Sequence, residues 1–182
     1  MRAVFPAIAA LVLLPAAALL SGCDDPFGNT QLIRQDSLTL AAANGPSSLP
    51  TAVDIVINNA PSFPELPSEA GSWDLQVRLQ GSTFYLHPNP GNGTYRGAGL
   101  AKTTRALETA GDAPIRSADY LRTPVAVNPG DTYYVQSRQL NSVCGTLPKY
   151  GILKVLSVSA DSGIVHVAVR SNQSCNDERL EE

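Results

Sequence analysis

The clearest pattern of hydrophobic and polar residues lies in the middle of the chain. Over residues 73–80 the apolar side chains recur at every second position, as on the buried face of a β-strand; they are Trp73, Leu75, Val77 and Leu79. The residues between them are charged or carry amides, so we expect that second face to meet water. Gly81-Ser82 follows directly and predicts a hairpin turn into a second strand over residues 83–87.

Shorter runs rich in apolar and β-branched residues predict the remaining strands. They cover residues 37–40, 53–57, 125–127 and 132–136, and a final hairpin contains strands over 150–158 and 164–170 around a turn at 160–163. Residues 101–110 are predicted to form one short helix, because Gly111 stands where a helix-ending glycine would. Seven or eight strands with at most one short helix predict an all-β fold, either an antiparallel β-sandwich or an open barrel.

The N-terminal residues have the pattern of a secretory signal. Arg2 is followed by an apolar run over residues 7–20; Pro6 directly precedes this run and Pro15 interrupts it. At the end of the run, Leu20-Ser21-Gly22-Cys23 resembles the lipobox of bacterial lipoproteins. The resemblance implies that the Cys23 thiol receives a diacylglycerol, that the chain is cut before Cys23, and that the new amine is acylated. A plain signal peptide and an uncleaved membrane-spanning helix are the alternatives, and the prolines fit a span of about 20 apolar residues poorly.

A lipid anchor determines the expected organisation and location of the chain. Residues 1–22 are the lipoprotein signal peptide, 23–36 a lipidated tether, 37–176 the β domain and 177–182 an acidic, solvated tail. The mature protein is expected in the cell envelope, on the extracytoplasmic side of a membrane, with the membrane and a membrane protein as its partners. Asp24 resembles the inner-membrane retention signal of enterobacterial lipoproteins, but the choice between inner and outer membrane stays open.

Charge narrows the class of partner. Removing Arg2 with the signal leaves 12 of the 13 Lys and Arg residues against 16 Asp and Glu, a net charge of −4. Nucleic-acid binding needs clustered cations, so this balance argues against a nucleic-acid partner. It also argues against a polybasic attachment to anionic lipid.

Two cysteines remain once Cys23 is assigned to lipid. In an oxidising compartment Cys144 and Cys175 most simply form a disulfide. The predicted C-terminal hairpin lies between them, and its antiparallel strands would bring the two cysteines to the same end. A redox or metal role is the alternative, although the chain has no Cys-x-x-Cys and no nearby histidine cluster.

The sequence lacks the common catalytic motifs, such as Gly-x-Ser-x-Gly, His-Glu-x-x-His and the phosphate-binding loop, so we do not expect an enzyme. A hydrolase assembled from separate Ser, His and Asp residues is a third class of function to weigh. The chain has two histidines, His87 and His166. Each alone is typical of a surface histidine, whereas together they could ligate a metal or a haem iron from two strands.

Three segments resemble HmuY-like lipoproteins. Residues 130–135 and 150–158 are similar to the last strands of that family, and Ser72-Trp73-Asp74-Leu75 is similar to its central Trp-Asp strand. The resemblance implies an all-β lipoprotein, and characterised members capture haem. Two hypotheses follow. The leading one is a membrane-anchored, non-catalytic binding or accessory module without a cofactor; the alternative is a haem-binding lipoprotein that uses His87 and His166.

Overall fold

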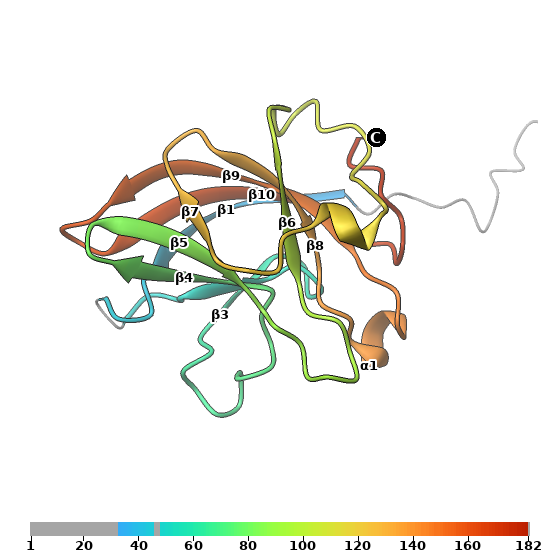
Figure 1. Ribbon diagram of the computed structural model, residues 1–182, viewed down its shortest axis with the longest axis horizontal. Helices are drawn as coiled ribbons and strands as arrows, with labels where there is room; N and C mark the ends of the chain where they lie inside the picture. Colours follow the sequence, from blue (N-terminus) through green and yellow to red (C-terminus); the bar gives the residue numbers. More distant parts are fainter. Residues whose placement is uncertain (1–32, 46–47, 182) are drawn as a thin grey trace, which may run out of the picture. The chain divides into compact units, whose positions relative to one another are not determined.

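The protein forms two antiparallel sheets of five strands each, which face each other as a β-sandwich (Figure 1). A computed structural model describes residues 33–45 and 48–181. The prediction of an all-β, antiparallel fold is confirmed, and the sandwich is the arrangement adopted. The described residues contain ten strands, more than the seven or eight expected. The two that were not predicted are Ala60–Ser62, which is too short to show an alternation, and Gly99–Thr103, most of which lies in the segment predicted as a helix.

The first sheet has the order β1-β10-β9-β8-β6. Its strands are β1 (Ile33–Ala41), β10 (Ile164–Asn172), β9 (Tyr150–Ser159), β8 (Thr132–Gln136) and β6 (Gly99–Thr103). β1 pairs with β10 along its full length, so it begins four residues before the predicted start at Ser37. The last part of the segment predicted as a tether is therefore strand. This part of β1 could not be recognised in the sequence, because residues 34–37 are polar and pair with β10 through their backbone.

The second sheet has the order β3-β2-β4-β5-β7. Its strands are β3 (Ala60–Ser62), β2 (Ala52–Asp54), β4 (Leu75–Gln80), β5 (Thr83–Pro88) and β7 (Val125–Val127). The hairpin of β4 and β5 is confirmed, with Gly81 at a positive φ of 62° in its turn. β2 is shorter than the predicted strand over 53–57, since the Ile57 N–H donates to the Asp54 carboxylate and the chain turns there.

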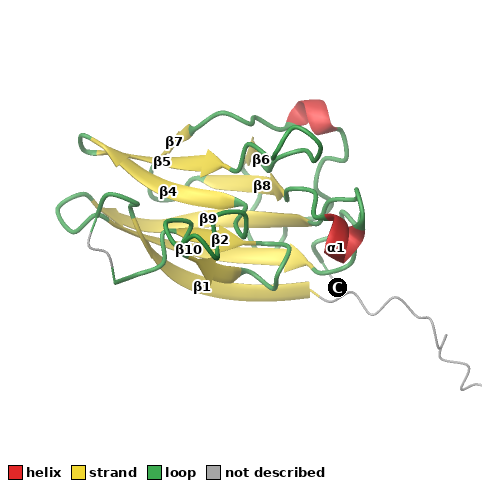
Figure 2. Ribbon diagram, turned by 90° about the horizontal axis from the view of Figure 1, so that it is seen from below, coloured by secondary structure: helices red, strands yellow, loops and turns green. Residues whose placement is uncertain are grey.

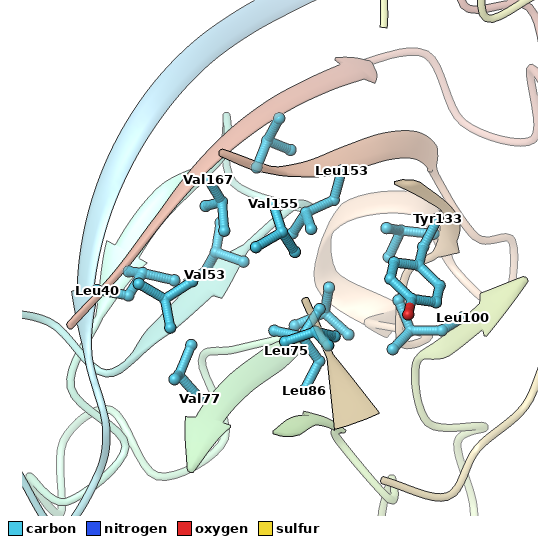
Figure 3. Packing of buried hydrophobic residues seen from close by; sticks show 14 of the residues in the cluster. Leu40, Val53, Leu75, Val77, Leu86, Leu100, Tyr133, Leu153, Val155 and Val167 are labelled. Carbon is cyan, nitrogen blue, oxygen red and sulfur yellow. The ribbon is translucent and has the colours of Figure 1, made fainter. Parts of the chain in front are cut away.

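The main core lies between the two sheets and is mostly aliphatic, with Phe84 and Tyr133 as its aromatic members. Figure 3 shows side chains of both sheets pointing toward one another, among them Leu40, Val155 and Val167 from the first sheet and Leu75 and Leu86 from the second. These side chains are almost fully buried. One prediction for β4 is wrong: its polar face does not meet water throughout, because Asp74 is 0% exposed and Gln76 only 4%. Loops cover that face at the start of the strand, as described below.

The prediction of a helix over residues 101–110 is also wrong. Its first residues belong to β6, which pairs with β8 from Gly99↔Gln136 to Thr103↔Thr132. Leu100 points into the main core, and this burial outweighs the helical preference of Ala and Leu. Among the described residues the helical pieces are α1 (Asn141–Cys144) and a 3-10 turn at Ser117–Asp119. No helix in this part of the chain is long and apolar enough to cross a bilayer.

A second apolar cluster covers part of the outer face of the first sheet. Tyr134 and Ile152 alternate with the core residues of β8 and β9, and they pack with Leu107, Ala110 and Leu180. The C-terminal residues up to 181 are therefore part of the domain instead of a solvated tail. Leu180 is 0% exposed. Backbone bonds from Ala113 N–H to Glu178 (2.9 Å) and from Leu180 N–H to Gly111 (3.2 Å) hold the segment.

The predicted disulfide is confirmed. Cys144, at the end of α1, is bonded to Cys175, which follows β10, with 5.6 Å between their Cα atoms. The bridge lies beside the start of β9, where Asn176 N–H donates to Pro148 (2.8 Å). It therefore ties the loop between β8 and β9 to the C-terminal segment. In Figure 2, α1 lies at the same end of the sandwich as the start of β1.

Candidate functional site

A buried ion cluster closes one end of the sandwich and connects the two sheets. Arg138, just after β8, makes a bidentate ion pair with Asp54 at the end of β2, with both N–O distances 3.0 Å. Its Nη1 also lies 3.2 Å from Oδ1 of Asp74, which precedes β4. The side chains of Arg138, Asp54 and Asp74 are 6%, 5% and 0% exposed. The charges are thus removed from water and compensate one another.

Asp74 also serves as an acceptor for the backbone of the surrounding loops. Its Oδ2 accepts from Ile55 N–H (2.6 Å) and Val56 N–H (3.2 Å), and its Oδ1 accepts from Arg138 N–H (2.7 Å). Burial raises the pKa of this carboxyl to about 6; the Arg138 charge opposes the rise and the neighbouring Asp54 charge adds to it. A polar residue that looked solvent-facing in the sequence therefore organises the end of the domain.

Lys149 adds a second cation to the cluster. It is 7% exposed, and its Nζ donates to the Val56 carbonyl (2.8 Å) and to Oε1 of Gln173 (2.9 Å). Burial lowers the pKa of this amine, and the charges of Asp54 and Asp74 oppose that change. Two carboxylates and two cations together fasten the loops after β2, β8 and β10.

A cavity opens next to this cluster. Its volume is about 590 Å³, within the usual range for ligand pockets. Three segments form the walls: residues 70–73, 89–95 and 138–142. Trp73, Tyr95 and Leu140 contribute half-buried rings and an alkyl group, and Arg138 lies where the pocket meets the ion cluster.

Hydrogen bonds fix the pocket walls against one another. The Nδ2 group of Asn89 donates to the Trp73 carbonyl (2.9 Å), and its Oδ1 accepts from Gly91 N–H (2.8 Å). The indole Nε1 of Trp73 donates to the Ala70 carbonyl (3.0 Å), which orients the ring. Gly97 is required beside this loop, because a Cβ there would lie 2.0 Å from the Asn89 carbonyl oxygen.

Gln139 joins the wall formed by residues 138–142 to the one formed by residues 89–95. Its backbone N–H donates to the Arg96 carbonyl (2.9 Å), and its Oε1 accepts from Arg96 N–H (2.9 Å). The side-chain amides of Asn89 and Gln139 are thus engaged with the backbone, and most of the pocket surface that remains for a ligand is apolar. Nε of Arg138 is buried without a hydrogen-bond partner among the described residues. The disulfide of Cys144 holds the far side of the same wall.

The structure does not bring the two histidines together. His87 is in β5 and alternates with the core residue Leu86, so its side chain is on the outer face of the second sheet. His166 is in β10 between the core residues Val165 and Val167, and it is exposed on the outer face of the first sheet. The core separates them, since packed sheets are about 10 Å apart and both rings point away from it.

Each histidine has local neighbours of its own. His87 contacts the ring of Tyr85 edge-on, with 6.4 Å between centroids, and burial followed by the Arg78 charge lowers the pKa of His87. Nδ1 of His166 is 2.9 Å from the Thr39 hydroxyl. Over residues 33–45 and 48–181, no group of three or more His, Cys, Asp or Glu side chains could hold a metal ion.

The remaining predicted site residue, Cys23, lies outside the described residues, as do the signal peptide and residues 23–32 of the tether. The ion cluster and the pocket were missed at the level of sequence. The sequence signal for the ion cluster was a charged residue between apolar neighbours. Asp54 lies between Val53 and Ile55, and Asp74 lies between Trp73 and Leu75. No protein-family model, curated protein or solved structure matches the chain.

Proposed function

We propose that the protein is a lipid-anchored binding module that works outside the cytoplasm without catalysing a reaction. The lipobox-like residues ending in Cys23 support the anchor. The disulfide supports an oxidising compartment, because such bonds persist mainly in secreted and envelope proteins. The pocket beside Arg138 is the proposed binding site, and a membrane protein is the proposed partner.

The observation that carries the proposal is the construction of the pocket. Its walls are fastened by Asn89 and Gln139 and rest on a buried ion cluster, so they are held in place before any ligand arrives. Pre-organised sites lose little conformational entropy on binding. Trp73 and Tyr95 offer large ring surfaces. Tryptophan and tyrosine are among the side chains that contribute most binding energy at protein interfaces. The pocket therefore suits an apolar or ring-bearing side chain of the partner.

Photo-crosslinking from the pocket tests this assignment. The full chain is produced in its native host with benzoylphenylalanine in place of Tyr95, or in place of exposed Thr83 at the opposite end as a control. We expect a discrete adduct after irradiation at position 95 that is absent at position 83. Adding Trp73→Ala should weaken the adduct. Equal labelling at both positions, or none at position 95, would contradict the proposed binding site.

A further inference from the structure

The chain enters the described domain at the end of the sandwich that holds the ion cluster. Ile33, the first residue of β1, pairs with Asn172 at the end of β10. The next carbonyl, that of Arg34, accepts from Nδ2 of Asn59 in the turn after β2 (3.3 Å). Figure 1 shows α1 and the start of β1 on the right, with the turns between β4 and β5 and between β9 and β10 on the left.

Two loops at this same end expose aliphatic side chains. Ile57, in the turn after β2, is 45% exposed; Val143 and Leu147, on and after α1, are 40% and 47% exposed. The loops are joined, because Lys149 Nζ donates to the Val56 carbonyl (2.8 Å). We call Ile57, Val143 and Leu147 the apolar tips.

The charges below the apolar tips are paired or hydrogen-bonded within the protein, with Nε of Arg138 as the one buried donor of this cluster that has no partner in the part of the chain that the structure describes. Asp54 and Arg138 are paired with each other, and Lys149 is bonded to a carbonyl and an amide. An approaching surface therefore meets alkyl groups first and does not have to compensate an unpaired buried charge. Aliphatic side chains on loop tips can enter the boundary between lipid headgroups and acyl chains without clustered lysines or arginines.

The end of the domain that carries the apolar tips is joined to the proposed lipid by a short stretch of chain, which favours the membrane as the surface that the apolar tips contact. Cys23 precedes Ile33 by ten residues, and ten residues span at most about 35 Å when fully extended. A lipid on Cys23 therefore keeps the start of β1 within about 35 Å of the bilayer, and the apolar tips lie at the same end of the domain. The hairpin turns at 81–82 and 160–163 lie at the far end of strands of six to ten residues.

We infer that the apolar tips dock onto the phospholipid surface, so that this end of the sandwich faces the membrane. The inference rests on the proposed lipid anchor and adds an orientation to it. The apolar tips insert at the headgroup boundary, and the two hairpin turns point into the aqueous compartment. The pocket beside Arg138 is then presented next to the membrane, within reach of a membrane protein.

Depth-dependent fluorescence quenching tests the orientation. The full-length lipoprotein is purified from its host and reconstituted into phosphatidylcholine vesicles. It carries a fluorescent amino acid at position 143 or, as a control, at Ser82 in the turn between β4 and β5. Quenching by lipids that bear a spin label on the acyl chain is compared at the two positions. We expect at least twofold stronger quenching at position 143.

A second variant separates docking from the anchor. With the probe at position 57, Leu147→Asp should reduce quenching to the level of position 82, while the protein still floats with the vesicles. Leu147 is exposed, so its replacement leaves the core intact. Equal quenching at positions 143 and 82 in a protein that floats would overturn the inference and leave the anchor standing. A protein that does not float would overturn both, and stronger quenching at position 82 would show that the opposite end faces the lipid.

Discussion

Removing the guanidinium from the buried ion cluster should destabilise the domain severely. Arg138→Met keeps the alkyl volume and leaves Asp54 and Asp74 without their ion-pair partner. Lys149, whose Nζ is bonded to the Val56 carbonyl and to Gln173, is then the remaining cation of the cluster. Breaking one partner of a buried ion pair costs about 3–5 kcal/mol, because an uncompensated charge remains in a site that excludes water. The Asp54 and Asp74 carboxyls are 5% and 0% exposed, so solvent cannot screen them. That cost approaches the whole stability of many domains, about 5–15 kcal/mol.

Urea unfolding of the purified protein measures this effect. Trp73 is the only tryptophan of the chain and borders the pocket, so its fluorescence reports on the end of the domain that holds the cluster. Far-ultraviolet circular dichroism reports on the sheets. The matched control is Arg34→Met, which removes an arginine from an exposed ion pair with Asp36 (2.7 Å). We expect the control to unfold with the wild-type midpoint and Arg138→Met to unfold at a much lower urea concentration.

Two results would refute the reasoning. If Arg138→Met unfolded with the same midpoint as Arg34→Met, the cluster would contribute no specific stability. If the fluorescence transition moved while circular dichroism stayed unchanged, the cluster would hold only the pocket loops and would not connect the two sheets.

Three further predictions follow from the site and the fold. Burial raises the pKa of Asp74 to about 6, so the folded state binds a proton at this carboxyl more tightly than the unfolded state does. The contribution of Asp74 to the free energy of unfolding should therefore decrease as the pH rises from about 4 to about 6. Asp74→Asn should therefore destabilise the protein more at pH 4.5 than at pH 7.5 in urea unfolding, and a reversed order would contradict the assigned direction. Replacing both Cys144 and Cys175 by Ala should cost about 3–4 kcal/mol in the chain-entropy model for a separation of 31 residues; an unchanged melting temperature under oxidising conditions would count against it. Since His87 and His166 lie on opposite outer faces, titration with haemin should give no bis-histidine absorption spectrum, and a spectrum abolished by either His→Ala change would show that the two rings converge.

Local alternation was enough to predict much of the fold. Residues 73–87 specify their hairpin through apolar residues at every second position and through Gly81-Ser82, both of which are local features. The long C-terminal hairpin and its disulfide follow from similar information, since two strands joined by a turn bring Cys144 and Cys175 to one end.

The parts that could not be predicted depend on contacts between distant residues. Residues 101–103 prefer a helix on composition, but pairing with β8 and burial of the neighbouring Leu100 decide their conformation. Leu180 stands in an acidic segment that is typical of a solvated tail, yet it is buried against the outer face of β8 and β9.

The ion cluster is the strongest case of this kind. Arg138 joins carboxylates that are 84 and 64 residues away along the chain. The residues near Asp54 and Asp74 in the sequence do not indicate which cation pairs with these carboxylates. A charged residue between β-branched or aromatic neighbours shows only that a compensating group must exist somewhere in the fold.

Mass spectrometry of the N-terminal peptide, from protein purified out of the membranes of its natural host, tests the lipid anchor most directly. A peptide that begins at Cys23 and carries the mass of a diacylglycerol thioether and an amide-linked acyl chain is the predicted result. An unmodified thiol at Cys23, or a peptide that still contains residues 1–22, would contradict it.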